Sequence, residues 1–356
     1  MSKLTSPSRT DLSEALSSKI LELILLPTEE CNFRCIYCYE DHVPGRMSNA
    51  TVAGIKRLIE RRMDDLQFLR LSWFGGEPLI AADILFEIGE FANKQCDARG
   101  VILAGDVTTN GFMLAPATMS RLVAAKHQQF FVSLAGAREV HDRLRPLVSG
   151  KGTFDRIWRN LTELRDSSLD FTIDLRLHFG PDIIPCEALC REVNDAFGDD
   201  GRFTVSLQRI ADLGGANTGT FDTVAPEDAR AIVWHLASLL PDVQVSNLYP
   251  KKHPICCAAR PNNMIIRTDG RLSRCACQLN DRRNFVGSID ADGHLALDQK
   301  QLNPWFKGYN SFDGNMLACP VNTVPREAWP EAAPTGLIPV ERLVGQRSTS
   351  TVVRAS

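Results

Sequence analysis

The chain has 356 residues, a mass of 39.5 kDa, a formal net charge of −3 and a pI near 6.2. This charge gives no broad basic field, which argues against nucleic acid or an anionic membrane as partner. No apolar run approaches the length that spans a bilayer, and the N-terminus has no apolar segment of a secretory signal. We therefore expect a cytoplasmic protein, long enough for one large domain and a smaller one.

The 11 cysteines are a high number for such a protein and are unevenly distributed. In a reducing compartment, cysteines in this number indicate metal or redox chemistry more than disulfides. Three lie within eight residues near the start of the chain, and five lie in its last third. Cys96, Cys186 and Cys190 lie between the two groups, and we interpret them as small buried apolar residues.

Apolar periodicity predicts alternating strands and helices from about residue 20. Residues 1–18 are polar and Ser-rich and are predicted to be a flexible lead-in. Helices are expected over 48–65, 82–96, 116–126, 153–167, 185–197 and 226–240, and strands over 20–27, 68–74, 104–111, 129–136, 170–179 and 202–210. Strands that alternate with helices pair in parallel through right-handed crossovers.

Two α/β architectures fit residues 19–245: a partial (β/α)₆ barrel or an open doubly wound sheet. In either, the chemistry belongs at the carboxyl ends of the strands. Candidate motifs fall at these ends: the three-cysteine loop after the first strand, Gly75–Pro78 after the second, Asn110–Gly111 after the third, and Ser133 on the fourth.

The strand–helix rhythm ends after residue 240. Two Asp-Gly pairs between apolar runs, at 269–270 and 292–293, predict β-hairpins. We expect a second, small β-rich domain over about 246–325 and a loose tail over 326–356, which has no periodicity.

The first cysteine group reads CNFRCIYC and supplies Cys31, Cys35 and Cys38. A closed zinc site needs four ligands, and His42 as the fourth fits zinc modules poorly. Three thiolates suit an iron–sulfur cluster that keeps one iron open for an exogenous ligand.

Several motifs resemble those of the radical S-adenosylmethionine (radical SAM) superfamily. They are CNFRCIYCYE, with aromatic Tyr37 before the third cysteine, WFGGEP after the second strand, and HDRLRP followed by GKGTFDRIWRNL. HDRLRP and GKGTFDRIWRNL are similar to segments of the peptide-modifying members that carry a SPASM or twitch extension. The resemblance implies a partial (β/α)₆ barrel with a twitch/SPASM-like domain. It also implies a [4Fe–4S] cluster on Cys31, Cys35 and Cys38 that cleaves S-adenosylmethionine to a 5′-deoxyadenosyl radical.

The resemblance also assigns contacts to S-adenosylmethionine, and Tyr37 is counted among the cofactor-binding residues. Gly75, Gly76, Glu77 and Pro78 would receive its ammonium group, although Gly-Gly also suits an ordinary tight turn. Ser133 would contact the ribose or the carboxylate, and Asn110 is a weaker candidate because Asn-Gly is a common turn. Arg145 would pair with the carboxylate, with Arg143 as competitor. Ala135 departs from the family, whose members usually carry Asp there.

The second cysteine group resembles the opening of a SPASM or twitch domain, from Cys257 through Gly270 to Cys275. We expect one auxiliary [4Fe–4S] cluster; its proposed ligands are Cys257, Cys275, Cys277 and Cys319. Cys256 fits almost as well as Cys257. The alternative is a decayed site with free thiols or zinc. The dense cysteine block of a full SPASM domain is missing, so a second auxiliary cluster is not expected.

Taken together, the resemblance implies an oxidoreductase that abstracts hydrogen from a ribosomally made peptide, giving a thioether or C–C cyclophane cross-link, or an oxidation. Alternatives are a sulfatase-maturase-like or small-molecule dehydrogenase, or a non-catalytic iron–sulfur scaffold. An electron donor such as flavodoxin or ferredoxin is implied. Only 30 residues precede Cys31, too few for a leader-binding domain, so a separate leader-recognition protein or strand addition at the β-domain edge is expected.

Overall fold

A computed structural model describes residues 7–43, 45–181, 186–248 and 255–324. Residues up to Val324 form one compact unit. The predicted tail over 326–356 lies outside the described residues. Among the described helices, none is long and apolar enough to cross a membrane.

One sheet of 11 strands runs through the compact unit, in the order β11-β10-β9-β8-β1-β2-β3-β4-β5-β6-β7. Neighbouring strands from β8 through β1 to β7 are parallel, and β8, β9, β10 and β11 pair antiparallel in turn. The strands are β1 (Ile20–Leu25), β2 (Phe68–Trp73), β3 (Ile102–Thr109), β4 (His127–Ala135), β5 (Thr172–Phe179), β6 (Phe203–Arg209), β7 (Gln244–Val245), β8 (Asn263–Ile266), β9 (Arg271–Ser273), β10 (Phe285–Ile289) and β11 (Leu295–Leu297).

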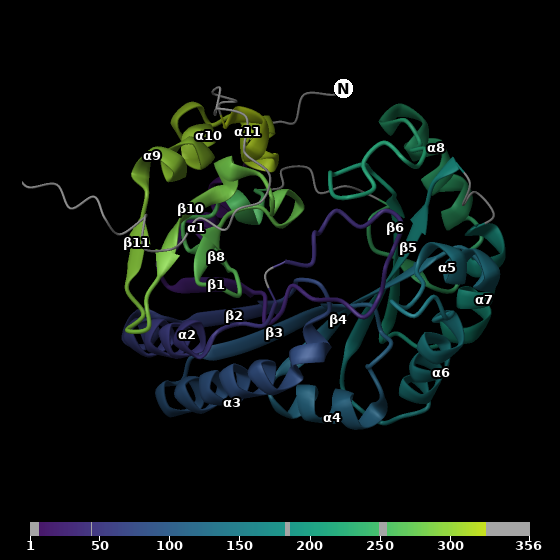
Figure 1. Cartoon of the computed structure of the whole chain (residues 1–356), viewed down its shortest axis with the longest axis horizontal. Helices are drawn as coiled ribbons and strands as arrows, with labels where there is room; N and C mark the ends of the chain where they lie inside the picture. Colours follow the sequence, from purple (N-terminus) through teal and green to yellow (C-terminus); the bar gives the residue numbers. More distant parts are fainter. Residues whose placement is uncertain (1–6, 44, 182–185, 249–254, 325–356) are drawn as a thin grey trace, which may run out of the picture. The chain divides into compact units, whose positions relative to one another are not determined.

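The helices that connect the parallel strands lie along one side of the sheet, as Figure 1 shows for α2, α3 and α4. Each parallel pair from β1 to β6 is joined by at least one helix, as crossovers require. The helices are α1 (Arg9–Leu16), α2 (Asn49–Arg62), α3 (Ala82–Arg99), α4 (Pro116–Ala124), α5 (Arg138–Leu144), α6 (Phe154–Arg165), α7 (Cys186–Phe197), α8 (Pro226–Ala237), α9 (Gln299–Leu302), α10 (Lys307–Ser311) and α11 (Gly314–Ala318).

Strict alternation along the strands separates a buried face from a polar face. In β2 and β5 every second residue is buried, and the residues between are half-buried or exposed. Successive side chains of a strand point to opposite faces, so one face packs on the helices and the other stays free for polar groups. Together with the open sheet, this confirms the partial barrel and argues against a doubly wound sheet, which carries helices on both faces.

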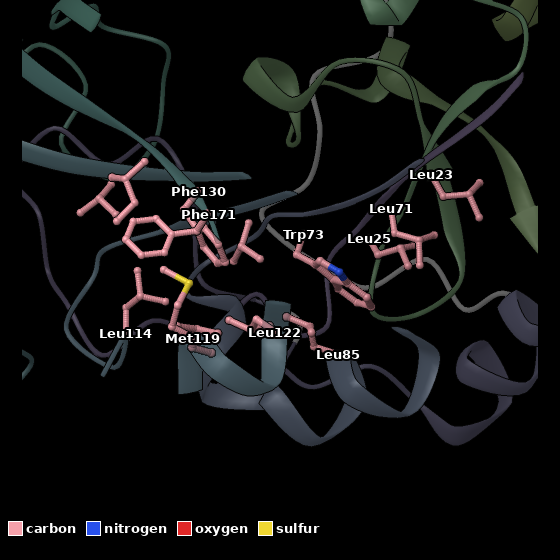
Figure 2. Packing of buried hydrophobic residues seen from close by; sticks show 14 of the residues in the cluster. Leu23, Leu25, Leu71, Trp73, Leu85, Leu114, Met119, Leu122, Phe130 and Phe171 are labelled. Carbon is pink, nitrogen blue, oxygen red and sulfur yellow. The ribbon is translucent and has the colours of Figure 1, made fainter. Parts of the chain in front are cut away.

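The main core lies between the sheet and the helices. Trp73 at the end of β2 and Phe130 on β4 are fully buried, and they pack with Leu85 of α3 and Met119 of α4 (Figure 2). Burying such side chains contributes about 1.5–3 kcal/mol each. This packing fixes the helices under the sheet and leaves the carboxyl ends of the strands to the loops.

Both predicted hairpins are present, as β8–β9 and β10–β11. They are joined edgewise to the parallel sheet through β8, so the sheet is continuous across the proposed boundary at 245–246. That boundary stays a prediction.

The flexible lead-in predicted over residues 1–18 differs from the structure, where α1 occupies Arg9–Leu16. Ser8 and Asp11 form a reciprocal capping box, and Ala15 is buried. The Ser-x-x-Asp spacing was the available signal.

Gly54 lets α2 approach the β10–β11 turn closely. A Cβ on Gly54 would collide with the backbone carbonyl of Asp290, which cannot rotate away. We expect Gly54→Ala to destabilise the protein by about 1–3 kcal/mol in urea unfolding, because overpacking outweighs the helix propensity of Ala. Gly201→Ala is the control, since nothing lies within 4 Å of its Cβ position. Equal stability of the two variants would contradict this packing.

Candidate active site

A cavity of about 360 Å³ opens at the carboxyl ends of the parallel strands. Its wall includes residues from the three-cysteine loop after β1, the turn after β2 and the ends of β3, β4, β5 and β6. The lining residues relevant here are Cys31, Phe33, Cys35, Tyr37, Cys38, Glu40, Gly75, Gly76, Asn110, Ser133, Arg145, Arg176, His178, Gln208, Arg209, Ala276 and Cys277. The structure thus brings together most of the residues predicted for the site.

The three-cysteine loop is held in place by the segment after α5. The backbone N–H of Arg34 donates to the carbonyl of Pro146 at 2.8 Å, and that of Ile36 donates to Leu144 at 3.0 Å. Burial raises the pKa of the Cys31 and Cys38 thiols to about 12. Without a cation these thiols are neutral at pH 7, and a metal would have to displace their protons.

The Gly-Gly turn after β2 packs directly on the residues that precede Cys31. Gly75 has φ 114°, a conformation that favours glycine. A Cβ on Gly75 would collide with the carbonyl of Thr28, and one on Gly76 with the carbonyl of Glu30. Both glycines line the cavity, and they also allow the loop to sit where it does.

Glu77 and Pro78 are not among the residues that line the cavity. The Glu77 carboxylate is fully buried and accepts hydrogen bonds from Thr109 Oγ1 at 2.8 Å and from the N–H groups of Asn110 at 2.7 Å and Leu79 at 3.0 Å. Burial raises its pKa. The described geometry gives Glu77 the role of joining the ends of β2 and β3.

Arg145 is a buried cation on the cavity wall, only 5% exposed. Its Nη1 donates to the Tyr37 hydroxyl at 3.0 Å, and its guanidinium lies over the ring of Phe33 at 5.8 Å. Its Nε has no hydrogen-bond partner and no carboxylate pairs with it among the described residues. A buried cation in this state is stabilised by an anion that enters the cavity.

Ser133 and Asn110 also line the cavity. Asn110 Nδ2 donates to Asn32 Oδ1 at 2.8 Å, and Asn110 Oδ1 accepts from the N–H of Phe112. Asn110 therefore stabilises the turn and also lines the cavity. Arg143, the competitor of Arg145, is exposed and outside the lining.

Sequence reasoning did not single out Arg176, His178, Gln208 and Arg209 as lining residues. The alternation in TIDLRLHF was an available signal: Arg176 and His178 fall on the face opposite the buried Leu175 and Leu177.

The residues present fit an iron–sulfur cluster that is open at one iron. Within the described ranges, no three His, Cys, Asp or Glu side chains meet so as to hold a single metal ion. A cubane cluster binds each thiolate through a different iron, so its ligands surround a volume and need not meet at one point. Three thiols on one cavity wall, beside a buried cation without a carboxylate, match that need.

Residues 25–181 match the family described as the Radical SAM superfamily. They form a radical SAM domain. The match covers β1 to β5 and all three cysteines of the loop.

Curated relatives of the radical SAM domain include two sulfatase-maturating enzymes. The serine-type anaerobic sulfatase-maturating enzyme of Klebsiella aerogenes is 27% identical over 152 residues, 42% of this chain and 37% of that protein. The cysteine-type enzyme of Clostridium novyi is 24% identical over 163 residues, 44% of this chain and 43% of that protein. The chain therefore spans about two fifths of these relatives in sequence.

Solved structures share the fold over a longer stretch. Native anSMEcpe with bound AdoMet and Cp18Cys peptide has a TM-score of 0.61 at 17% identity and covers 84% of this chain and 83% of that chain. Streptococcus suis SuiB bound to its precursor peptide SuiA has a TM-score of 0.58 at 16% identity, with coverage of 88% and 73%. At this identity the likeness shows the fold alone.

Beyond the radical SAM domain, the C-terminal cysteines gather beside the same cavity. Cys277 lines it, and its thiol shares a hydrogen bond with Cys275. Behind larger causes, the charge of Cys256 contributes to raising the pKa of Cys275 and of Cys319. Cys257 is exposed, and its neighbours are Cys256, Glu22 and Arg274. These electrostatic contacts are the reason why Cys256 is proposed below in place of Cys257, and the ligand assignment stays a prediction.

A buried polar network shapes this second thiol group. Arg274 is fully buried and donates to the carbonyls of Ala258 at 3.1 and 2.9 Å and of Arg260 at 2.5 Å. Asn284, also fully buried, accepts from the backbone N–H of Arg274 and of Cys275, both at 2.8 Å. These bonds connect the loop that contains Cys256 to the residues after β9, among them Cys275.

Proposed function

We propose that the chain is a radical SAM enzyme that modifies a peptide. The observation that carries the proposal is the convergence of Cys31, Cys35, Cys38 and the unpaired Arg145 on one cavity of a radical SAM domain. When bound and reduced, a [4Fe–4S] cluster in this superfamily supplies a 5′-deoxyadenosyl radical from S-adenosylmethionine.

In this proposal the protein's own residues bind, orient and shield. The three thiolates hold three irons, and Tyr37 and Phe33 keep water from the loop. Arg145 neutralises the carboxylate of S-adenosylmethionine, and Ser133 and Asn110 offer polar contacts. The backbone of Gly75 and Gly76 faces its ammonium group, while Glu77 holds that turn from behind.

The test is production of 5′-deoxyadenosine. The protein is reconstituted anaerobically with iron and sulfide, reduced, and mixed with S-adenosylmethionine. We expect 5′-deoxyadenosine and methionine in equal amounts by mass spectrometry. Intact S-adenosylmethionine after full reduction of an iron-loaded protein would support the non-catalytic scaffold instead.

Arg145→Gln tests the cofactor pocket. Loss of a charge-assisted bond costs about 1.5–3 kcal/mol, so we expect the affinity for S-adenosylmethionine to fall roughly ten- to a hundredfold with iron content intact. Equilibrium dialysis with labelled S-adenosylmethionine measures it. Arg143→Gln is the matched control, since Arg143 is exposed. Equal affinities of both variants and the wild type would place the carboxylate elsewhere.

The substrate is proposed to be a peptide, supported by the relatives, two of which have been solved with bound peptides. We favour a cross-link, thioether or C–C, in a ribosomally made precursor. Sulfatase-type oxidation of Ser or Cys is the second candidate, favoured by the curated relatives. A hydrazine reagent separates them on a sulfatase-derived Cys peptide, because only the oxidation leaves an aldehyde. An electron donor such as flavodoxin or ferredoxin and a separate leader-recognition protein belong to the same proposal.

One auxiliary [4Fe–4S] cluster is proposed on Cys256, Cys275, Cys277 and Cys319. Iron counting tests it: we expect about eight irons per wild-type chain and about four after Cys256→Ala or in a Cys31/Cys35/Cys38 triple-Ala variant. Cys257→Ala should keep about eight. A triple variant without iron after anaerobic reconstitution would exclude the auxiliary cluster. Four irons in Cys257→Ala with eight in Cys256→Ala would instead assign Cys257 as the ligand, as the sequence predicted.

A further inference from the structure

Strand β5 forms one wall of the cavity and carries two hydrogen-bond donors that have no role in the proposed cofactor contacts. Arg176 and His178 both line the cavity and lie two residues apart, so they share the face of β5 that is turned away from the helices. Both are half-buried. Cys277 lines the same cavity.

Arg176 has no hydrogen-bond or ion-pair partner among the described residues. Its guanidinium stacks on the ring of Phe131 at 4.2 Å, which orients the planar fork without satisfying its N–H groups. The two carboxylates whose charges act on Arg176, Asp106 and Asp174, already accept hydrogen bonds from other residues. Asp106 accepts from Ser72 at 2.7 Å and from Arg70 at 3.3 Å.

The second nearby carboxylate, Asp174, is hydrogen-bonded by hydroxyl groups. It accepts from the hydroxyls of Ser206 and of Ser246, the latter at 2.7 Å. Burial lowers the pKa of Arg176 against the charges of both acids, and neither acid forms an ion pair with it.

His178 presents an N–H to the cavity. Arg145 can only donate, so the Tyr37 hydroxyl accepts from it, and we assign the proton of that hydroxyl to the bond with His178 Nδ1, at 3.0 Å. Burial, with Arg145 and Arg176, lowers the pKa of His178 to about 3, so the ring is neutral. A neutral ring that accepts at Nδ1 carries its proton on Nε2. Among the described residues, no acceptor contacts that Nε2.

The cavity wall is rich in cations. Arg145, Arg176 and Arg209 line it, and Glu40 is its single carboxyl among the described lining residues. Arg145 is assigned to the cofactor carboxylate, and Arg209 donates to the carbonyl of Val224 at 2.9 Å. Arg176 is therefore the cation left for a second anion.

We propose that Arg176, with His178 Nε2–H, binds a carboxylate of the peptide substrate. The inference rests on the proposed function and narrows it: the peptide carries an acidic residue, or its own C-terminal carboxylate, near the carbon that is modified. A planar guanidinium and a neighbouring N–H on one strand face suit a carboxylate in two-point contact.

The test uses labelled decapeptides of Gly, Ala and Ser and the iron-loaded, oxidised enzyme with S-adenosylmethionine. The peptides carry two central Glu with an amidated end, two Gln with an amidated end, two Gln with a free carboxyl end, or two Lys with an amidated end. Fluorescence anisotropy gives the affinities. The Glu and free-end arms separate a side-chain carboxylate from a terminal one.

We expect the wild type to bind the Glu peptide, or the free-end peptide, about tenfold or more tightly than the amidated Gln peptide. Arg176→Gln should remove this preference, Arg176→Lys should keep part of it, and Arg176→Glu should favour the Lys peptide. Arg159→Gln is the control, an exposed Arg on α6 outside the lining. Melting temperatures exclude misfolding as the cause.

Three results would overturn the inference. The first is equal binding of the Glu, Gln and free-end peptides to the wild type, which includes undetectable binding of all three. The second is a preference that survives Arg176→Gln. The third is a loss of S-adenosylmethionine affinity in Arg176→Gln as large as in Arg145→Gln, which would assign Arg176 to the cofactor. Production of 5′-deoxyadenosine by the wild type is measured in parallel. It tests the proposed function separately, so the carboxylate site can fail while the proposed function holds.

Discussion

Cys35→Ala is expected to abolish 5′-deoxyadenosine production while the protein stays folded. Cys35 is one of three thiols on the cavity wall, and no fourth thiol of the loop can replace it. A cluster held by two thiolates is not retained as an open [4Fe–4S] site. We expect the product to fall below the detection limit of mass spectrometry, with the iron content reduced by about four per chain.

Cys257→Ala is the matched control for this loss, because Cys257 is an exposed thiol outside both proposed ligand sets. It should keep its iron and its activity. Circular dichroism should show the same melting transition for Cys35→Ala without cluster as for the wild type without cluster. Near wild-type 5′-deoxyadenosine from purified Cys35→Ala would refute the assignment of the loop.

Arg267→Met should destabilise the protein by about 3–5 kcal/mol in urea unfolding. Arg267 and Glu29 form an ion pair whose side chains are only 3% and 4% exposed, with Arg267 Nε 2.9 Å from Glu29 Oε1. Removing the cation leaves the Glu29 carboxylate buried beside Glu40, and removes a bond to the carbonyl of Leu279. The pair also joins the residues before Cys31 to the turn after β8, so the loop should loosen as well.

Two variants make the prediction about Arg267 specific. Arg57→Met breaks an exposed pair with Glu60, at 63% and 42% exposure, and should cost at most about 1 kcal/mol. The double change Glu29→Leu with Arg267→Met removes both buried charges and should recover much of the loss. Equal unfolding midpoints for Arg267→Met and Arg57→Met would show that the pair contributes little.

Local patterns sufficed for the parallel sheet and for the first thiol group. The alternation in β2 and β5 marks their buried faces, and the three cysteines lie in one loop whose spacing is readable directly. The cavity position followed because parallel strands present their carboxyl ends at one edge.

Contacts between segments that are far apart in the chain could not be predicted from the sequence. Glu29 and Arg267 are 238 positions apart, and no local period links them. Cys256 and Cys257 are adjacent and carry the same spacing signal, and only the fold brings the charge of Cys256 near Cys319. Glu77 was assigned to the cofactor by its motif, and its three hydrogen bonds to β3 and the turn appear only in three dimensions.

The central claim is that the cluster on Cys31, Cys35 and Cys38 keeps an iron open for S-adenosylmethionine. The most direct measurement is electron paramagnetic resonance of the reduced Cys275→Ala/Cys277→Ala variant, in which only the loop can hold a cluster. We predict a [4Fe–4S]⁺ signal whose shape changes when S-adenosylmethionine is added, because its amino and carboxylate groups would bind the open iron. A signal that stays the same at saturating S-adenosylmethionine would contradict the claim.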